Sequence, residues 1–350
     1  MKNKILFRVD GSYHLGMGDI ISMINLAEKL DDFEILEILF VSKYMEGIKK
    51  INEFGYKVEK IPEDINLKEE IGIIKKINEK FKSNVIIVEL IRNDYQEYCR
   101  ELSKINKTLI IDFFGNIEVY SDILVNWDIL SKNRKYIKKN KNTIYCLGPK
   151  YSLLKEQVYK YHNLNKLIKD KVETVLITMG GTDPRNLTPK IINALKNFKN
   201  IKFNVVMGSA FRNKDEIKRI LKDNNLKYDL IENPNELLEL IYNVDLAICA
   251  GGLTSFELCA IGTPFIGISN IEWEADRLKR MEEKGICKYA GDWKNFDEKE
   301  LYNIFKDFVY NKEEREKMSI NGKKLLDGRG AERISNIIKE VIKNGNKTNS

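Results

Sequence analysis

Short apolar runs alternate with amphipathic stretches along most of the chain. Runs rich in valine, isoleucine and leucine occur at residues 5–9 and 85–89, whereas segments such as 67–81 repeat apolar residues every three or four positions. Strands take the form of continuous apolar runs when helices cover both faces of a parallel sheet. The alternation therefore predicts an α/β fold with parallel sheets.

The alternation occurs in two rounds, separated by a looser stretch at 148–171. We predict two doubly wound, Rossmann-like domains facing across a cleft: an N-terminal domain at 1–150, a linker at 151–170 and a C-terminal domain with terminal helices at 171–345. Ligands bind such sheets at the carboxyl ends of strands. The predicted strands are 5–9, 35–41, 58–61, 85–89, 108–112, 123–126, 143–146, 174–178, 203–207, 228–231, 246–249 and 265–268; the predicted helices lie near 19–30, 43–54, 67–81, 95–104, 187–198, 213–223, 235–242, 254–261, 274–284 and beyond about 297.

Composition and charge fit two such domains. The 350 residues are 43% hydrophobic and 10% aromatic, which is enough for two cores. The 59 Lys and Arg against 52 Asp and Glu give a net charge of +7, and these charges are interspersed apart from a short basic run at 132–141. Interspersed charge is typical of a solvated surface and not of a nucleic-acid interface. We therefore expect no nucleic-acid partner.

The five cysteines are isolated and show no metal-ligand spacing. Their odd number and wide separation favour a reducing compartment and buried thiols. The amino terminus enters a strand directly, and no apolar run approaches the ~18 residues of a spanning helix. We therefore expect a soluble, cytoplasmic protein with no membrane span.

The first predicted strand runs into a glycine-punctuated loop, FRVDGSYHLGMGDIIS, at residues 7–22. Loops of this kind commonly hold a phosphate at the start of the following helix. Asp19 opens that helix, however, and its charge would repel a phosphate. The loop could therefore be a ligand site, a catalytic site or a capped helix start.

The segment LITMGGTDPRN, at 176–186, predicts an anion site in the second domain. Gly180 and Gly181, followed by Thr182, allow close approach of a ligand to the backbone and leave amides free to hold an anion. The alternative is a tight turn capped by Asp183, with Pro184 at the first helical position.

The segment ICAGGLTSFELCAIGTPFIGI, at 248–268, repeats this arrangement with more detail. Gly251 and Gly252 end a buried strand, and Thr254 and Ser255 open a helix whose first amides attract phosphate. Glu257 lies one turn inside the helix, where it could accept hydrogen bonds from sugar hydroxyls.

These segments resemble those of a known family. MGGTDPRNLT, AGGLTSFELCAIGTPFIGI, FRVDGSYHLGMG, SDILVN and GPKYSLLKEQV are similar to segments of the nucleotide-sugar hydrolases of pseudaminic acid biosynthesis and their relatives in spore-coat polysaccharide synthesis. The likeness covers roughly residues 4–290, and a more distant one extends to the UDP-N-acetylglucosamine transferase of peptidoglycan synthesis. The resemblance implies the glycosyltransferase-B architecture, a UDP-sugar substrate and no metal or other cofactor.

The resemblance also implies site residues. Amides of the two glycine loops would hold the diphosphate, Glu257 would bind the ribose, and the first loop would face the reacting sugar. The implied substrate-binding residues are Arg8, Asp10, Gly16, Gly18, Gly180, Gly181, Thr182, Gly251, Gly252, Thr254, Ser255, Glu257, Trp273 and Glu274.

The chain departs from the family at the reaction centre. Where the family has a histidine that activates water, this chain has Asp19, and the arginine expected three residues later is Ser22. Trp273 and Glu274 align with an Asn-Gln pair of the family that contacts substrate, although they could equally form an ordinary helix start.

Asp19 is the first candidate base, because a carboxylate can accept the proton of an attacking water. We expect the helix N-terminus to stabilise its anion and make it a weaker base than histidine; the alternative is a helix cap. His14, in the same loop, is the second catalytic candidate. His162 and Asp112 are further candidates, Asp112 with a loop-starting cap as its alternative.

The function predicted from the sequence is release of UDP from a UDP-acetamido-deoxysugar by water, with Asp19 or His14 assisting. Two alternatives stay open. One is a metal-independent inverting glycosyltransferase that passes the sugar to a hydroxyl. The other is a nucleotide-sugar-binding protein without catalytic activity.

Overall fold

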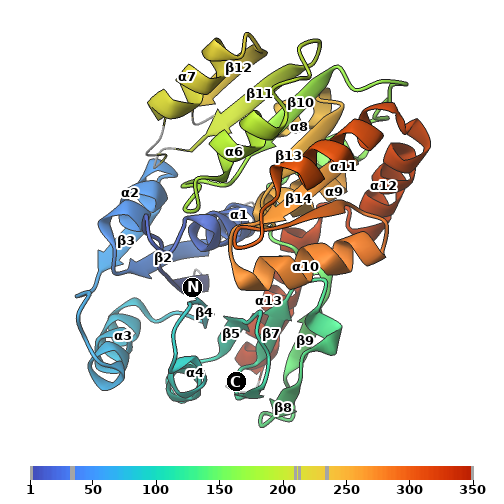
Figure 1. Cartoon of the computed structure of the whole chain (residues 1–350). Helices are drawn as coiled ribbons and strands as arrows, with labels where there is room; N and C mark the ends of the chain where they lie inside the picture. The colour runs from blue at the N-terminus through green and yellow to red at the C-terminus, as the bar shows by residue number, and fades with distance from the viewer. Residues whose placement is uncertain (1–2, 32–35, 209–210, 212–213, 233–235, 348–350) are drawn as a thin grey trace. The chain divides into compact units, whose positions relative to one another are not determined.

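The computed structural model describes residues 3–31, 36–208, 211, 214–232 and 236–347 (Figure 1). It divides into two compact units: unit 1 comprises Met1–Glu156 and Arg329–Ser350, and unit 2 comprises Gln157–Gly328. Predicted elements began at Ile35, Asn213 and Asn235, which lie outside the described residues.

Unit 1, within its described residues, is built on a seven-stranded parallel sheet with the order β3-β2-β1-β4-β5-β7-β9. A reciprocal pair of hydrogen bonds caps α3 (Leu67–Phe81): the Asn66 side chain accepts from Glu69 N, and the Glu69 side chain accepts from Asn66 N. The strands are β1 (Asn3–Val9), β2 (Leu36–Ser42), β3 (Lys57–Lys60), β4 (Val85–Glu89), β5 (Thr108–Ile111), β7 (Ile123–Asn126) and β9 (Ile144–Leu147); the helices are α1 (Gly18–Asp31), α2 (Met45–Glu53), α3 (Leu67–Phe81), α4 (Tyr95–Ser103) and α13 (Gly330–Lys347).

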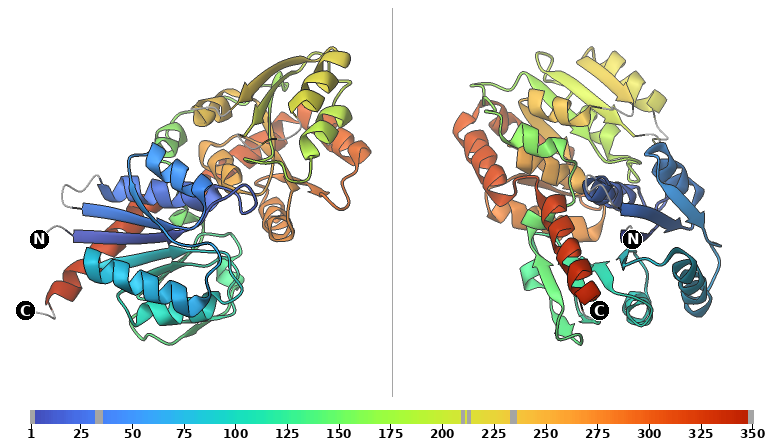
Figure 2. Two further views of the ribbon diagram at one scale, coloured as in Figure 1. Left: turned by 90° about the vertical axis from the view of Figure 1, so that its left-hand side faces the viewer. Right: turned by 180° about the vertical axis from the view of Figure 1, so that it is seen from behind.

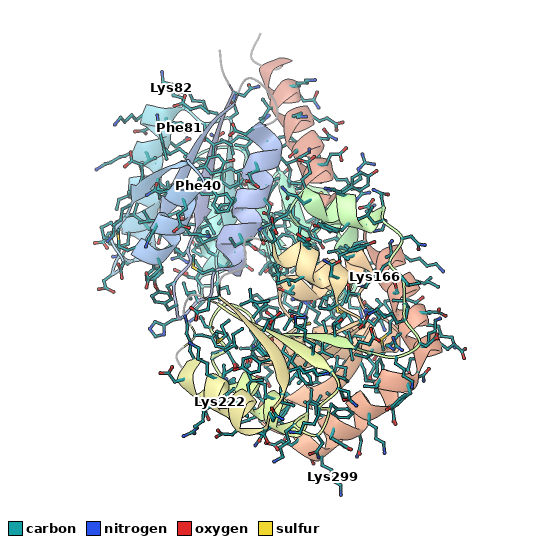
Figure 3. The ribbon with its side chains drawn as sticks, turned by 90° about the horizontal axis from the view of Figure 1, so that it is seen from above. Phe40, Phe81, Lys82, Lys166, Lys222 and Lys299 are labelled. Carbon is teal, nitrogen blue, oxygen red and sulfur yellow. The ribbon has the colours of Figure 1, made fainter. Side chains whose placement is uncertain are left out.

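Unit 2 repeats the plan with a six-stranded parallel sheet in the order β12-β11-β10-β13-β14-β15. Lys166, labelled in Figure 3, donates to Val244 O at 2.8 Å just past the end of α8 and thereby satisfies a carbonyl left over by that helix. The strands are β10 (Thr174–Thr178), β11 (Lys202–Met207), β12 (Lys227–Glu232), β13 (Leu246–Cys249), β14 (Phe265–Ser269) and β15 (Lys288–Asp292); the helices are α5 (Gln157–His162), α6 (Leu187–Ala194), α7 (Lys214–Asp223), α8 (Leu237–Asn243), α9 (Leu253–Ile261), α10 (Glu272–Glu283), α11 (Glu298–Tyr310) and α12 (Lys312–Leu325).

These two parallel sheets confirm the predicted α/β fold class with two Rossmann-like domains. Several elements were missed by the sequence analysis, because they are too brief to show a period or, in β15, lack a continuous apolar run. They are the two-stranded sheet of β6 (Ile117–Val119) and β8 (Tyr136–Lys138), the 3-10 turns η1 (Ser131–Asn133) and η2 (Pro149–Tyr151), α5 within the predicted linker, and β15.

The last helix corrects the predicted domain boundary. The sequence analysis assigned all terminal helices to the second domain, but α13 packs on α1 and η2 of unit 1, as Figure 2 shows for the red C-terminal helix. The buried side chains Ile334, Ile338 and Ile342 recur every four residues and form its apolar face. Lys107 Nζ also donates to Val341 O at 2.9 Å. A sequence period shows that α13 has a buried face but not which sheet covers it.

Each sheet has one point at which the winding reverses. In unit 1 the chain winds from β1 to β2 and β3 on one side, and from β4 to β5 on the other, so the reversal lies between β1 and β4. In unit 2 it lies between β10 and β13. Ligands of open α/β sheets bind where the strand order reverses, because the loops diverge there and leave a crevice. Ligand sites are therefore expected at these two places.

All five cysteines are buried and free, as the sequence analysis expected. In the ranges that the structure covers, no helix combines the length and the apolar character that a membrane crossing requires.

Candidate functional site

The loop after β1 folds tightly before α1 begins at Gly18. Ser12 and Gly16 pair through their backbones, with Gly16 at φ +86°, and Ser12 Oγ accepts from the amides of His14 (3.3 Å) and Leu15 (3.2 Å). Gly11, which the sequence analysis did not single out, is required here, because a Cβ at this position would lie 2.4 Å from Ile20 Cγ1. This close approach brings the start of α1 against the end of β1.

A pocket of about 200 Å³ opens at the carboxyl ends of β1 and β4, the reversal point of unit 1. It mixes charged groups with a few apolar side chains, all from unit 1. Its lining residues are Arg8, Asp10, Leu15, Asp19, Lys43, Tyr44, Leu90, Ile91, Arg92 and Asp94. The predicted residues Arg8, Asp10 and Asp19 therefore come together, whereas His14, Gly16 and Gly18 shape the loop without lining this pocket.

A buried charge network supports one side of the pocket. Arg8, which is fully buried, donates to both carboxylate oxygens of Asp10 at 2.7 and 2.8 Å and, through Nε, to Glu70 at 2.8 Å. Lys43 and Arg92 also contact Glu70, at 3.0 and 3.1 Å. Burial opposes the charge of Glu70, but the cations outweigh it and hold the pKa of this carboxyl at about 2. Each pocket cation is therefore already paired with a carboxylate.

Glu70, Lys43 and Arg92 were not predicted as site residues. Glu70 lies on α3, and Lys43 and Arg92 lie in the loops after β2 and β4. No motif marks them, since only the fold brings their side chains to Arg8. The available signal was a charged residue on the buried face of the helix, one turn before Ile74: Glu70 is fully buried.

Asp19 is the second residue of α1 and remains partly exposed on the pocket. Within the described residues, its carboxylate forms no hydrogen bond with a helix amide, so the cap alternative gains no support. Burial, followed by the nearby charge of Asp10, raises the pKa of Asp19 to about 6. Asp19 is therefore a stronger base than an ordinary aspartate, and its pKa of about 6 still does not exceed the usual histidine value of about 6.5, as the comparison with histidine expected.

The remaining candidate residues lie outside the pocket. The side chain of His14 is exposed. The buried Asp112 accepts from Gly115 N at 2.7 Å and from Tyr136 Oη at 3.0 Å, as its loop-cap alternative predicted. In unit 2, His162 Nδ1 contacts Ala260 O at 2.8 Å. The buried Ser22 occupies the place where an arginine was expected.

The first glycine loop of unit 2 leaves space for a ligand. A Cβ on Gly180 or Gly181 would meet nothing within 4 Å, and Gly180 has φ +81°, which favours glycine. Asp183 accepts from the amides of Leu187 (2.9 Å) and Thr188 (2.8 Å), which confirms it as a cap. Helix α6 starts only at Leu187, so the prediction that Pro184 opens it is wrong; the turn Asp183–Asn186 intervenes.

The second glycine loop follows β13, the strand beside β10, so both loops end strands at the reversal point. Gly252 is the N-cap of α9 and has no side chain to close its first amides. Thr254 stays partly exposed in that first turn, whereas Ser255 is buried and donates to Gly252 O at 2.7 Å. Glu257 lies one turn inside and is buried.

Trp273 and Glu274 help to shape the second glycine loop. Glu274 is buried and accepts a hydrogen bond from Asn270 N at 2.9 Å. A Cβ added to Gly251 would lie 2.8 Å from the Cβ of Glu274. Arg277 lies over the Trp273 ring at 4.6 Å and donates to Gly251 O at 2.6 Å. Their helix-start alternative therefore has direct support. No group of three or more potential metal-ligating His, Cys, Asp or Glu occurs among the described residues.

Curated relatives resemble much of the chain. An uncharacterized protein of Methanocaldococcus jannaschii is 34% identical over 297 residues, which are 80% of this chain but 59% of that protein's length. The spore coat polysaccharide biosynthesis protein SpsG of Bacillus subtilis is 25% identical over 95% of this chain and 96% of its own. The UDP-2,4-diacetamido-2,4,6-trideoxy-β-L-altropyranose hydrolase of Campylobacter jejuni is 28% identical over 81% and 97%. No family model matches the chain.

Solved structures match across both units. MurG of Acinetobacter baumannii superposes with a TM-score of 0.70 at 12% identity, covering 97% of this chain and all of that one. The chain has the glycosyltransferase-B type of fold. A UDP-GlcNAc 2-epimerase from Neisseria meningitidis bound to UDP-GlcNAc gives 0.60 at 15% identity over 97% and 99% of the two chains.

Proposed function

We propose that the protein hydrolyses a UDP-sugar, releasing UDP from an acetamido-deoxysugar used for a surface glycan or a nonulosonic acid of the pseudaminic type. The observation that carries this proposal is the position of both Gly-Gly loops at the reversal point of unit 2, in a chain that is 28% identical to a UDP-sugar hydrolase. The spore-coat polysaccharide relative supports a role in glycan synthesis.

The nucleotide part of the substrate is proposed to bind unit 2. Gly180 and Gly181 are open to a ligand, and the first amides of α9 follow Gly252 without a side-chain cap. Backbone amides at a helix N-terminus bind a diphosphate and stabilise the charge that develops as it leaves. Residues 180–182 and 251–257 are the proposed UDP site, with Glu257 accepting from the ribose.

The proposed proton acceptor is Asp19. A carboxyl with a pKa of about 6 is largely ionised at neutral pH and is still basic enough to take a proton from water. The water oxygen would bond to the anomeric carbon as its proton passes to a carboxylate oxygen of Asp19. The bond from that carbon to the diphosphate oxygen breaks, and its electron pair leaves with UDP.

One observation favours the transferase alternative. Leu15 and Ile91 line the pocket of unit 1 and are 44% and 55% exposed. Exposed apolar side chains beside a reaction site suit an acceptor that carries an apolar part. The hydrolase and the transferase share the same leaving group and the same base, and they differ only in which hydroxyl attacks.

The test is incubation of the protein with UDP-acetamido-deoxysugars, with UDP and free sugar measured together. Equal amounts of both support hydrolysis, and the Asp19→Asn variant should bind UDP normally while producing both far more slowly. UDP release that requires an added hydroxyl acceptor would favour transfer. Tight UDP binding without any turnover would overturn both enzymes in favour of a binding protein.

A further inference from the structure

Glu89 is a buried carboxyl that the proposed reaction does not use. It is the last residue of β4, 3% exposed, and faces Val9 on one neighbouring strand and Ile111 on the other. Neither of its carboxylate oxygens has a hydrogen-bond partner among the described residues. Buried polar groups in proteins are nearly always paired, so a carboxyl left in this state calls for a functional explanation.

In the part of the chain that the structure describes, no cation pairs with the Glu89 carboxylate. Side chains alternate along a strand, and Val88 belongs to the core cluster that includes α4, so Glu89 points to the opposite face. Arg8 is engaged by Asp10 and Glu70, and Lys43 and Arg92 also contact Glu70. An unpaired buried charge is so costly that such a group takes up a proton instead.

The charged and titratable groups around Glu89 act in the same direction. Burial, followed by the charge of Asp19 on α1, raises the pKa of Glu89 well above its usual range. On α4, which packs on the other face of the sheet, the buried Tyr95 donates to Ile111 O at 2.6 Å. Asp112, which follows Ile111 on β5, has its carboxylate occupied by Gly115 and Tyr136. All of these groups are neutral or negative, and none stabilises a second anion.

We propose that Glu89 is a positioning residue of the unit 1 pocket: it remains a neutral carboxylic acid close to Asp19 and makes Asp19 the single carboxylate of this pair. An ionised Glu89 would add a third negative charge to those of Asp19 and Asp10. That repulsion would drive a proton onto Asp19 at neutral pH and leave the site without a base. The catalytic consequence rests on the proposed function, whereas the protonation of Glu89 does not.

Infrared spectroscopy of the whole chain tests the protonation directly, through the C=O band of a protonated carboxyl. At pH 7 the wild type should show this band. Glu89→Gln should abolish its Glu89 component, and Glu59→Gln, which changes an exposed glutamate of β3, should leave it in place. A wild type without the band, or a band unchanged by Glu89→Gln, would overturn the inference.

The coupling to Asp19 gives a second readout that a merely structural role would not move. Asp19→Asn removes the neighbouring charge, so the Glu89 band should disappear at a lower pH than in the wild type; an unchanged midpoint would contradict the pairing. This variant also keeps the test decisive should Glu89→Gln fold poorly. With a UDP-sugar, Glu89→Gln should retain kcat within a few-fold and keep the acidic midpoint near that of the wild type, because one neutral group replaces another. A wild type that shows the band but releases no UDP would refute the proposed function and leave this inference standing.

Discussion

Replacing Asp19 with asparagine should stabilise the protein, and more so at higher pH. The pKa of Asp19 rises from 3.8 to about 6 on folding, so the folded state binds the proton more tightly. Stability from this group is therefore fully present below about pH 4 and is lost as the pH rises through about 6. At about 1.4 kcal/mol per unit, the full shift corresponds to roughly 3 kcal/mol. Solvent reaches this partly exposed side chain and reduces the effect, so we expect about 1–3 kcal/mol.

Thermal unfolding of the wild type and Asp19→Asn between pH 4 and 8 measures this difference. A domain of 150–250 residues gains about 2–4 °C in Tm per kcal/mol, so the variant should gain roughly 2–12 °C at pH 8 relative to its difference at pH 4. Asp64→Asn, at an exposed position of the same unit, is the control and should show no such trend. A Tm difference that is independent of pH would refute the raised pKa, and with it the reason for choosing Asp19 as the base.

Four other variants test the rest of the site. Glu70→Ala leaves three buried or half-buried cations without their shared carboxylate, so denaturant unfolding should show a loss of about 3–5 kcal/mol; a loss under 1 kcal/mol would contradict the network. Gly251→Ala brings a Cβ to within 2.8 Å of Glu274 and should lower the free energy of unfolding by about 1–3 kcal/mol. In Gly181→Ala the added Cβ meets no atom within 4 Å, so Tm should stay unchanged while UDP affinity, measured by calorimetry, falls. Equal UDP affinity in the wild type and Gly181→Ala would exclude this loop from the nucleotide site. His14→Ala, at an exposed position outside the pocket, should change kcat less than about tenfold, whereas Asp19→Asn should reduce kcat by roughly 10²–10⁴; the reverse order would make His14 the base.

The secondary structure followed closely from the sequence. Strands β4, β7, β10 and β13 have the bounds that their apolar runs predicted. Fully buried parallel strands carry their signal in consecutive residues, so no distant contact is needed to recognise them. Strand β15, with the sequence KYAGD, lacks such a run and was missed for that reason.

The candidate site was predictable only in part. Both Gly-Gly loops could be identified because adjacent glycines after a buried strand are a local feature of the sequence, and a Cβ on Gly180 or Gly181 would meet open space. The roles of Ser255, Asp183 and Asp112 depended on which amide or carbonyl each side chain reaches. Those partners are set by loop geometry, which a list of residue types does not specify.

The sequence by itself determined two α/β domains, the glycine loops and the presence of an acid at the start of α1. Only the tertiary structure decided the pKa of that acid, Asp19. Asp19 has a pKa of about 6 because folding buries it beside Asp10, and Glu89 lies unpaired because Glu70 holds the cations on the other face of the sheet. Helical and strand periods are local properties of a chain, whereas the charge of a carboxyl depends on solvent and on ions that distant segments bring to it.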